Sequence, residues 1–123
     1  MIKPTNILLI SLALLLCGCG DSGKAANSDF EGRLKAALAV KETGQRDEAL
    51  KIVATDSATA GNGTVCLEAV SKVSSRTRRD DLAEDCAIRL AKAGESTAAS
   101  DVANQIRASG RRNEANKKIA AIK

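Results

Sequence analysis

Apolar residues along this chain recur three and four positions apart, which is the spacing of one face of an amphipathic helix. Ala36, Ala37 and Val40 form one such stripe, and Ala69 and Val70 begin another that continues to Val73. No stretch alternates apolar and polar residues as a half-buried strand would. The pattern predicts an all-α protein without strands, with six helices at residues 30–43, 47–59, 65–75, 80–93, 98–108 and 113–122.

The predicted helices repeat at a fixed interval. A shift of 33 positions (47 to 80 to 113) aligns the turns, the glycines and the apolar positions of successive helix pairs. The sequence therefore predicts three units of helix, short turn and helix, the last truncated at Lys123. The aligned turns read Gly44-Gln45-Arg46-Asp47-Glu48-Ala49, Thr77-Arg78-Arg79-Asp80-Asp81-Leu82 and Gly110-Arg111-Arg112-Asn113-Glu114-Ala115.

Polar residues at the ends of the predicted helices suit capping roles. Asp47, Asp80 and Asn113 would open the second helix of each unit, where their side chains can accept from free N–H groups. Gly61 and Gly94 follow the first two of these helices, where a left-handed C-terminal cap favours glycine. Thr64 and Ser96 supply hydroxyl groups for the start of the next helix.

The string Gly44-x-x-Asp47-Glu48-Ala49-Leu50, after a helix of about three and a half turns, resembles the turn and second-helix opening of tetratricopeptide (TPR) repeats. The resemblance covers most of residues 29–123. It implies an αα-hairpin solenoid of about three TPR-like repeats that binds a protein or peptide along the inner surface of its first helices. The corresponding residues are Leu34, Leu38, Lys41, Leu67, Ser71, Ser74, Ser100, Asn104 and Arg107. The alternative for the leucines is that they close the protein's own core.

The N-terminal segment has the features of an export leader. Lys3 precedes ten uncharged residues, 7–16, which are too few to span a bilayer as a helix. Leu16-Cys17-Gly18-Cys19 then resembles the lipobox of bacterial lipoproteins. The resemblance implies a signal peptide over residues 1–18, acylation of Cys19, and a flexible tether over residues 19–28. Acylation of Cys17 and a plain secretory leader are the alternatives.

Residue 20 is Gly and not Asp, so the usual inner-membrane retention residue of lipoproteins is absent. This favours a location at the outer membrane, facing the periplasm, with several acyl chains providing a stable anchor. The domain itself then occupies residues 29–123.

Cys66 and Cys86 flank the second turn at nearly equal distances. In an antiparallel hairpin they would lie at the same height and face one another. An oxidising compartment would make such a pair a structural disulfide, which for a loop of this size stabilises by roughly 3 kcal/mol. A metal-binding or redox-active pair has little support, because the chain lacks histidine and a C-x-x-C spacing.

Composition argues against catalysis. Without histidine, neither a Ser-His nor a Cys-His nucleophile pair can form, so we expect neither an enzyme nor a bound metal or cofactor. The net charge of +4 is mild, and the single aromatic residue cannot provide base stacking, so we do not expect nucleic acid as a partner. A predicted basic edge comprises Arg46, Arg78, Arg79, Arg111 and Arg112, for which the alternative is a solvated surface neutralised by adjacent acids.

Two functions fit these features. The first is a lipid-anchored envelope adaptor that binds a partner protein or peptide through the helical repeat surface. The second is a small envelope lipoprotein that acts as an inhibitor, exclusion or immunity factor without using a groove. The sequence does not identify the partner.

Overall fold

The computed structural model describes residues 29–122, which are helical or lie in short turns and contain no β-strand. A first helix covers residues 29–38. It is followed by α2 (Thr43–Thr59), α3 (Gly63–Ser71), α4 (Arg76–Lys92), α5 (Ser96–Ala103) and α6 (Ser109–Ala121). The predicted all-α class is confirmed. The predicted signal peptide, the acylated Cys19 and the tether lie outside the described residues.

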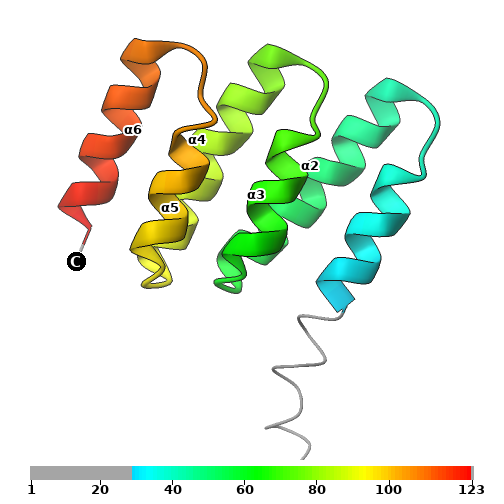
Figure 1. Cartoon of the computed structure of the whole chain (residues 1–123), viewed down its shortest axis with the longest axis horizontal. Coiled ribbons are helices and arrows are strands. Elements are labelled where there is room, and N and C mark those ends of the chain that lie inside the picture. The colour runs from blue at the N-terminus through cyan, green and yellow to red at the C-terminus, as the bar shows by residue number, and fades with distance from the viewer. Residues whose placement is uncertain (1–28, 123) are drawn as a thin grey trace, which may run out of the picture.

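The helices form three antiparallel pairs that stand side by side in chain order (Figure 1). The first helices of the pairs make one layer, in which α3 contacts α5, and the second helices make another, in which α4 contacts both α2 and α6. The loops within the pairs lie along one edge of the array, and the two turns that connect the pairs lie along the opposite edge (Figure 1). Equivalent loops of successive pairs are therefore neighbours.

The second helices begin four residues earlier than predicted, at Thr43, Arg76 and Ser109 in place of residues 47, 80 and 113. The expected N-caps Asp47 and Asp80 consequently lie in the second turn of α2 and α4, and this part of the prediction was wrong. Ser75 caps α4 by accepting from the N–H of Arg78. Glu42 and Ala108 precede α2 and α6 at the same position and make no capping side-chain bond. The aspartates have a different role, described below.

The start of α3 was also assigned to the wrong residue. The carboxamide oxygen of Asn62 accepts from the N–H of Val65 at 3.1 Å, so Asn62 and not Thr64 caps this helix. Glu95 precedes α5 at the equivalent position without a side-chain cap, and Ser96 is already the first helical residue.

Gly61 and Gly94 confirm the predicted left-handed caps, with φ of 82° and 88°. At each site the glycine N–H and the next N–H bond to carbonyls of the preceding last turn. Gly61 donates to Ala58 and Asn62 donates to Ser57, and the same pair of bonds recurs after α4. This pairing is the Schellman arrangement, which turns the chain sharply from one helix pair to the next.

One continuous hydrophobic core runs through all three pairs. It is built mostly from small residues, so the helices approach closely and little area is buried per residue. The fully buried side chains include Leu50, Leu90, Ile106, Val70 and Val102. Phe30, the only aromatic residue of the chain, lies at the end of the core formed by the first helix.

Candidate functional site

The three equivalent arginines of the predicted basic edge make the same bond in each unit. The guanidinium groups of Arg46, Arg79 and Arg112 donate to the backbone carbonyl six residues earlier, at 3.4, 3.3 and 3.0 Å. These carbonyls belong to Val40, Val73 and Ile106. Each arginine therefore holds the loop that leads into its own helix, and its guanidinium is not a freely accessible charge.

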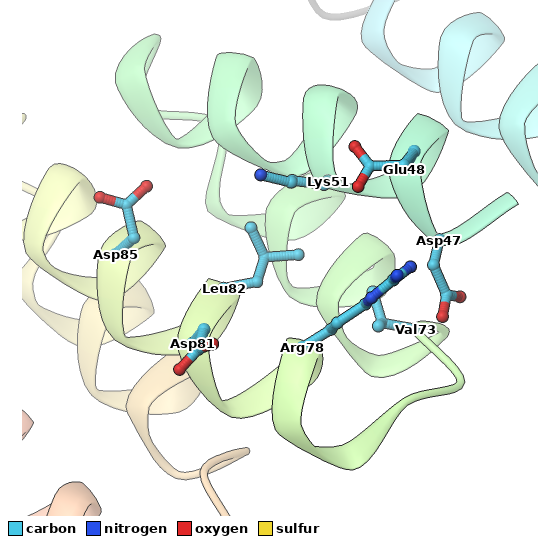
Figure 2. Close-up of a pocket in the computed structure, with 8 residues that line it drawn as sticks. All are labelled: Asp47, Glu48, Lys51, Val73, Arg78, Asp81, Leu82 and Asp85. Atoms are coloured by element: carbon cyan, nitrogen blue, oxygen red, sulfur yellow. The ribbon is translucent and has the colours of Figure 1, made fainter. Parts of the chain in front are cut away.

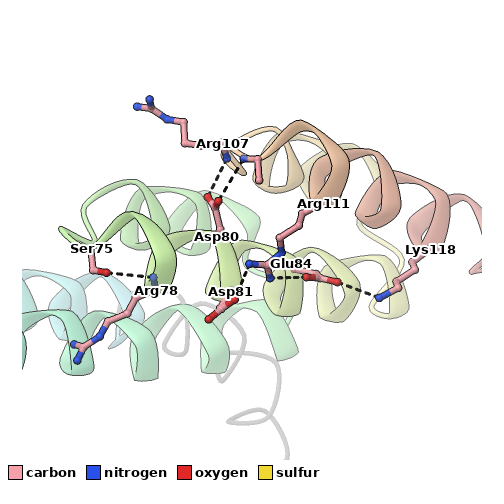
Figure 3. Close-up of polar contacts among 9 residues, drawn as sticks. Ser75, Arg78, Asp80, Asp81, Glu84, Arg107, Arg111 and Lys118 are labelled. Atoms are coloured by element: carbon pink, nitrogen blue, oxygen red, sulfur yellow. Dashed lines mark hydrogen bonds and ion pairs between the residues drawn. The ribbon is translucent and has the colours of Figure 1, made fainter.

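The aspartates next to these arginines hold the loop of the following unit. The Asp47 carboxylate accepts from the N–H groups of Ser74 at 2.9 Å and Ser75 at 3.3 Å. Asp80 repeats the arrangement with Arg107 at 2.9 Å and Ala108 at 3.4 Å (Figure 3). Both aspartates are nearly buried, so their bonds form in an environment where an unpaired carboxylate would be costly. We call this arrangement the loop clamp.

The predicted partner-binding leucines belong partly to the core. Leu34 is only 5% exposed, so a ligand-facing role for it is wrong and the alternative, core packing, holds. Leu38 and Leu67 are half-buried and pack against the core from its surface. Leu67 also borders a shallow cavity of about 260 Å³ between α3 and α5, beside Ala98 and Asp101.

The polar residues of the predicted surface are accessible. Lys41, Ser71, Ser74, Asn104 and Arg107 are exposed, and Ser100 is half-buried. The Ser71 hydroxyl donates to the carbonyl of Glu68. Ser74 and Arg107 use their backbone N–H groups in the loop clamps, which leaves their side chains available to a partner.

The exposed apolar residue of the described region lies elsewhere. Ile52, on α2, is 55% exposed and is the one large hydrophobic side chain of residues 29–122 that is exposed. Sequence reasoning missed it because the helical stripe alone does not distinguish the core face of α2 from its flank.

Cys66 on α3 and Cys86 on α4 are both fully buried. They are free thiols in the structure, so the predicted disulfide is not formed there. The thiols are nevertheless in contact. The pKa of Cys86 is raised, first by the hydrogen bond with Cys66 and then by burial, and both causes disfavour a reactive thiolate.

A cleft of about 310 Å³ lies between α2 and α4, on the layer of second helices (Figure 2). Val73 and Leu82 form its apolar floor, and both side chains are almost completely buried. Its rim carries charges from both helices: Asp47, Glu48, Lys51, Arg78, Asp81 and Asp85. This cleft was not predicted, because its residues come from two different units. The sequence does not specify how far apart in space those units lie.

The equivalent position between α4 and α6 is occupied by ion pairs (Figure 3). Arg111 contacts Asp81 and Glu84, both at 2.8 Å, and Lys118 contacts Glu84 at 3.0 Å. The hydrogen bonds from Arg111 and then Lys118 lower the pKa of Glu84. The bonds that Arg111 donates to Glu84 and then to Asp81 raise the pKa of Arg111. Of the predicted basic edge, Arg111 is thus paired, whereas Arg78 lies over the open cleft (Figure 2).

Among residues 29–122, no group of three or more His, Cys, Asp or Glu side chains is arranged to hold a metal ion. Within the same residues, none of the helices has both the length and the apolar composition needed to cross a bilayer. No protein-family model, curated protein or solved structure matches this chain.

Proposed function

We propose that this chain is a lipid-anchored envelope adaptor, in which a TPR-like solenoid of three helix pairs binds a partner protein or peptide. The recurrence of specific hydrogen bonds at the sequence period carries the proposal. The arginine-to-carbonyl bond occurs three times and the aspartate clamp twice, each 33 residues apart (40 to 73 to 106 and 47 to 80). Because the same hydrogen bonds recur at the sequence period, the units are equivalent in structure as well as in sequence, which supports a true repeat. Repeat proteins present extended surfaces for recognition.

The proposed binding surface is that of the first helices. It comprises Leu38 and Lys41 in the first unit, Leu67, Ser71 and Ser74 in the second, and Asn104 and Arg107 in the third. The half-buried leucines supply apolar contact at one end, and the exposed polar side chains supply hydrogen bonds and charge at the other. An extended or helical segment of an envelope protein is the ligand class that such a gradient fits.

The anchor and the sulfur pair complete the proposal. An acylated Cys19 would hold the domain at the outer membrane, facing the periplasm, and export would expose the chain to oxidation. The contact between the Cys66 and Cys86 thiols supports closure to a disulfide there. A mass lower by two hydrogens in the protein isolated from envelopes, without reductant, is the expected result, and two free thiols would contradict it.

Capture of the partner tests the proposed surface. The full-length chain is isolated from detergent-solubilised envelopes as wild type, as a Leu38→Asp/Leu67→Asp variant and as a Lys41→Glu/Arg107→Glu variant. The second variant changes only exposed side chains, so it separates binding from folding. Lys92→Glu, an exposed charge reversal at the end of α4, is the matched control.

We expect both double variants to lose the partner while the control retains it, with helicity measured by circular dichroism in each case. Retention by the Lys41/Arg107 variant would exclude the first-helix surface. The same fractionation checks the anchor, because Cys19→Ser should move the chain into the soluble fraction. If that variant stays with the membrane, the lipid assignment is wrong.

The second function, an inhibitor, exclusion or immunity factor without a groove ligand, is favoured by one observation. The exposed large hydrophobic side chain in residues 29–122, Ile52, lies on a second helix and not on the proposed binding surface. Loss of partner capture in Ile52→Asp, with capture retained in both double variants, would favour this function.

A further inference from the structure

The cleft between α2 and α4 and the ion-pair network between α4 and α6 are built from equivalent positions. Residues 48, 51, 78 and 85 become 81, 84, 111 and 118 after the shift of 33. In the network, the carboxylate of Glu84 is central, because Arg111 and Lys118 both donate to it. In the cleft the central position is Lys51, and an acid, Asp85, stands where the network has Lys118. The cleft therefore lacks a central carboxylate between its cations.

Most acids on the rim of the cleft are already paired elsewhere. Asp47 holds the loop clamp, Asp81 is bound by Arg111 at 2.8 Å, and Asp85 is bound by Arg89 at 2.9 Å. The hydrogen bond that Arg89 donates to Asp85 is also the main cause that raises the pKa of Arg89, so this carboxylate is already paired. Most of the negative charges on the rim are thus neutralised by groups that do not line the cleft.

The cations of the cleft are not paired. The side chains of Lys51 and Arg78 make no hydrogen bond or ion pair with any of residues 29–122, and both residues are exposed. Glu48 is likewise unpaired there, so the uncommitted charges sum to one positive charge (two cations and one acid). Lys51 comes from α2 and Arg78 from α4, so the two cations border the cleft from opposite helices (Figure 2).

We propose that the α2–α4 cleft binds a carboxylate carried by, or next to, an aliphatic residue of a peptide. The carboxylate lies between Lys51 and Arg78 and takes the place that Glu84 has in the network. The aliphatic side chain rests on Val73 and Leu82, and Glu48 occupies the position beside Arg78 that Asp81 has beside Arg111. The volume of about 310 Å³ is at the lower end of the range for ligand pockets, which fits one or two residues and not a cofactor.

The carboxylate can come from a chain terminus or from an acidic side chain, and the two sources share this chemistry. The proposal concerns the layer of second helices, so it rests neither on the lipid anchor nor on the first-helix surface. Loss of one binding activity leaves the other measurable.

Fluorescence anisotropy with three short labelled peptides tests the proposal, using the full-length chain in detergent. One peptide ends in leucine with a free carboxylate, the second ends in leucine amide, and the third is an amide with glutamate before the leucine. We expect the amide without glutamate to bind more than about tenfold more weakly, because it loses the charge-assisted contacts with both Lys51 and Arg78. Binding of only the first peptide identifies a terminus as the ligand, and binding of the third identifies a side chain.

Four variants sharpen the test. Lys51→Ala and Arg78→Ala should each weaken binding of the carboxylate peptides about tenfold, and Lys92→Ala should leave it unchanged. Lys51→Glu places an internal carboxylate at the central position, so it should abolish peptide binding and also raise the unfolding midpoint through a new pair with Arg78. Equal binding of all three peptides, binding that survives the Lys51 and Arg78 changes, or no binding by any peptide would overturn the proposal.

Discussion

The two joints between successive helix pairs use the same clamp and differ in almost everything else. In the first joint Asp47 of α2 holds the loop before α4, and in the second Asp80 of α4 holds the loop before α6. Beside the clamp, the second joint is sealed by Arg111, Glu84 and Lys118, whereas the first is an open cleft. The backbone bonds of the clamp set how one pair stacks on the next, so the remaining surface of a joint is free to vary.

The two joints also differ within the layer of first helices. In the second joint Gly63 packs directly against Ala98, and an added Cβ would lie well inside van der Waals contact with the Ala98 methyl group. The equivalent positions of the first joint, 33 residues earlier, are Phe30 and Val65, which are much larger. The second joint is therefore closed by close backbone approach, and the first by side-chain bulk.

Removal of the clamp should have the largest effect on stability. Asp47→Ala and Asp80→Ala each leave two loop N–H groups without their charged acceptor, so we expect a loss of about 2–3 kcal/mol in the free energy of unfolding. Urea unfolding followed by circular dichroism measures it. Asn113→Ala is the matched control, since Asn113 is the exposed equivalent in the last unit, and it should change stability by less than about 0.5 kcal/mol. A cost at Asn113 equal to that at Asp80 would show that the clamp is not what matters at this position.

The close approach in the second joint comes next. Gly63→Ala should cost about 1–3 kcal/mol, because the new methyl group forces α3 and α5 apart. Gly110→Ala provides the contrast: it lies in α6 with open space around it, so the change should stabilise by up to about 1 kcal/mol through better helix propensity. If both substitutions stabilise, the joint is not tightly packed at Gly63.

The ion-pair network should contribute least. The pKa of Glu84 is lowered in the folded state, so its contribution to stability is present above the unfolded-state pKa and is lost as the pH falls through the folded-state pKa. We expect Glu84→Gln to cost at most about 1 kcal/mol at neutral pH, because the partners are partly exposed, and to lose part of the acid dependence of unfolding. Arg78→Ala, at the open joint, should leave the neutral-pH stability and the pH profile nearly unchanged. If the pH dependence of unfolding is the same in wild type and Glu84→Gln, the ion-pair network does not contribute to it.

The order of helices and the sharp turns after α2 and α4 were predictable. Apolar spacing identifies a helix because each residue advances by a fixed angle, and Gly61 and Gly94 mark positions where only glycine is unstrained. The start of the second helices was predicted four residues late, since an aspartate near a helix start is normally taken as its cap. Asp47 and Asp80 instead accept from backbone N–H groups of loops 27 and 28 residues further along the chain. The residues around each aspartate do not indicate such remote partners.

The sequence by itself determined the helical class, the number of pairs and their 33-residue period, because these depend on local periodicity and on glycine's backbone freedom. Only the tertiary structure decided that Leu34 closes the core, that Arg46, Arg79 and Arg112 serve the loops, and that Lys51 and Arg78 border an open cleft. These outcomes depend on which side chains of neighbouring units meet. That is set by how the pairs stack in space, and periodicity along the chain does not encode it.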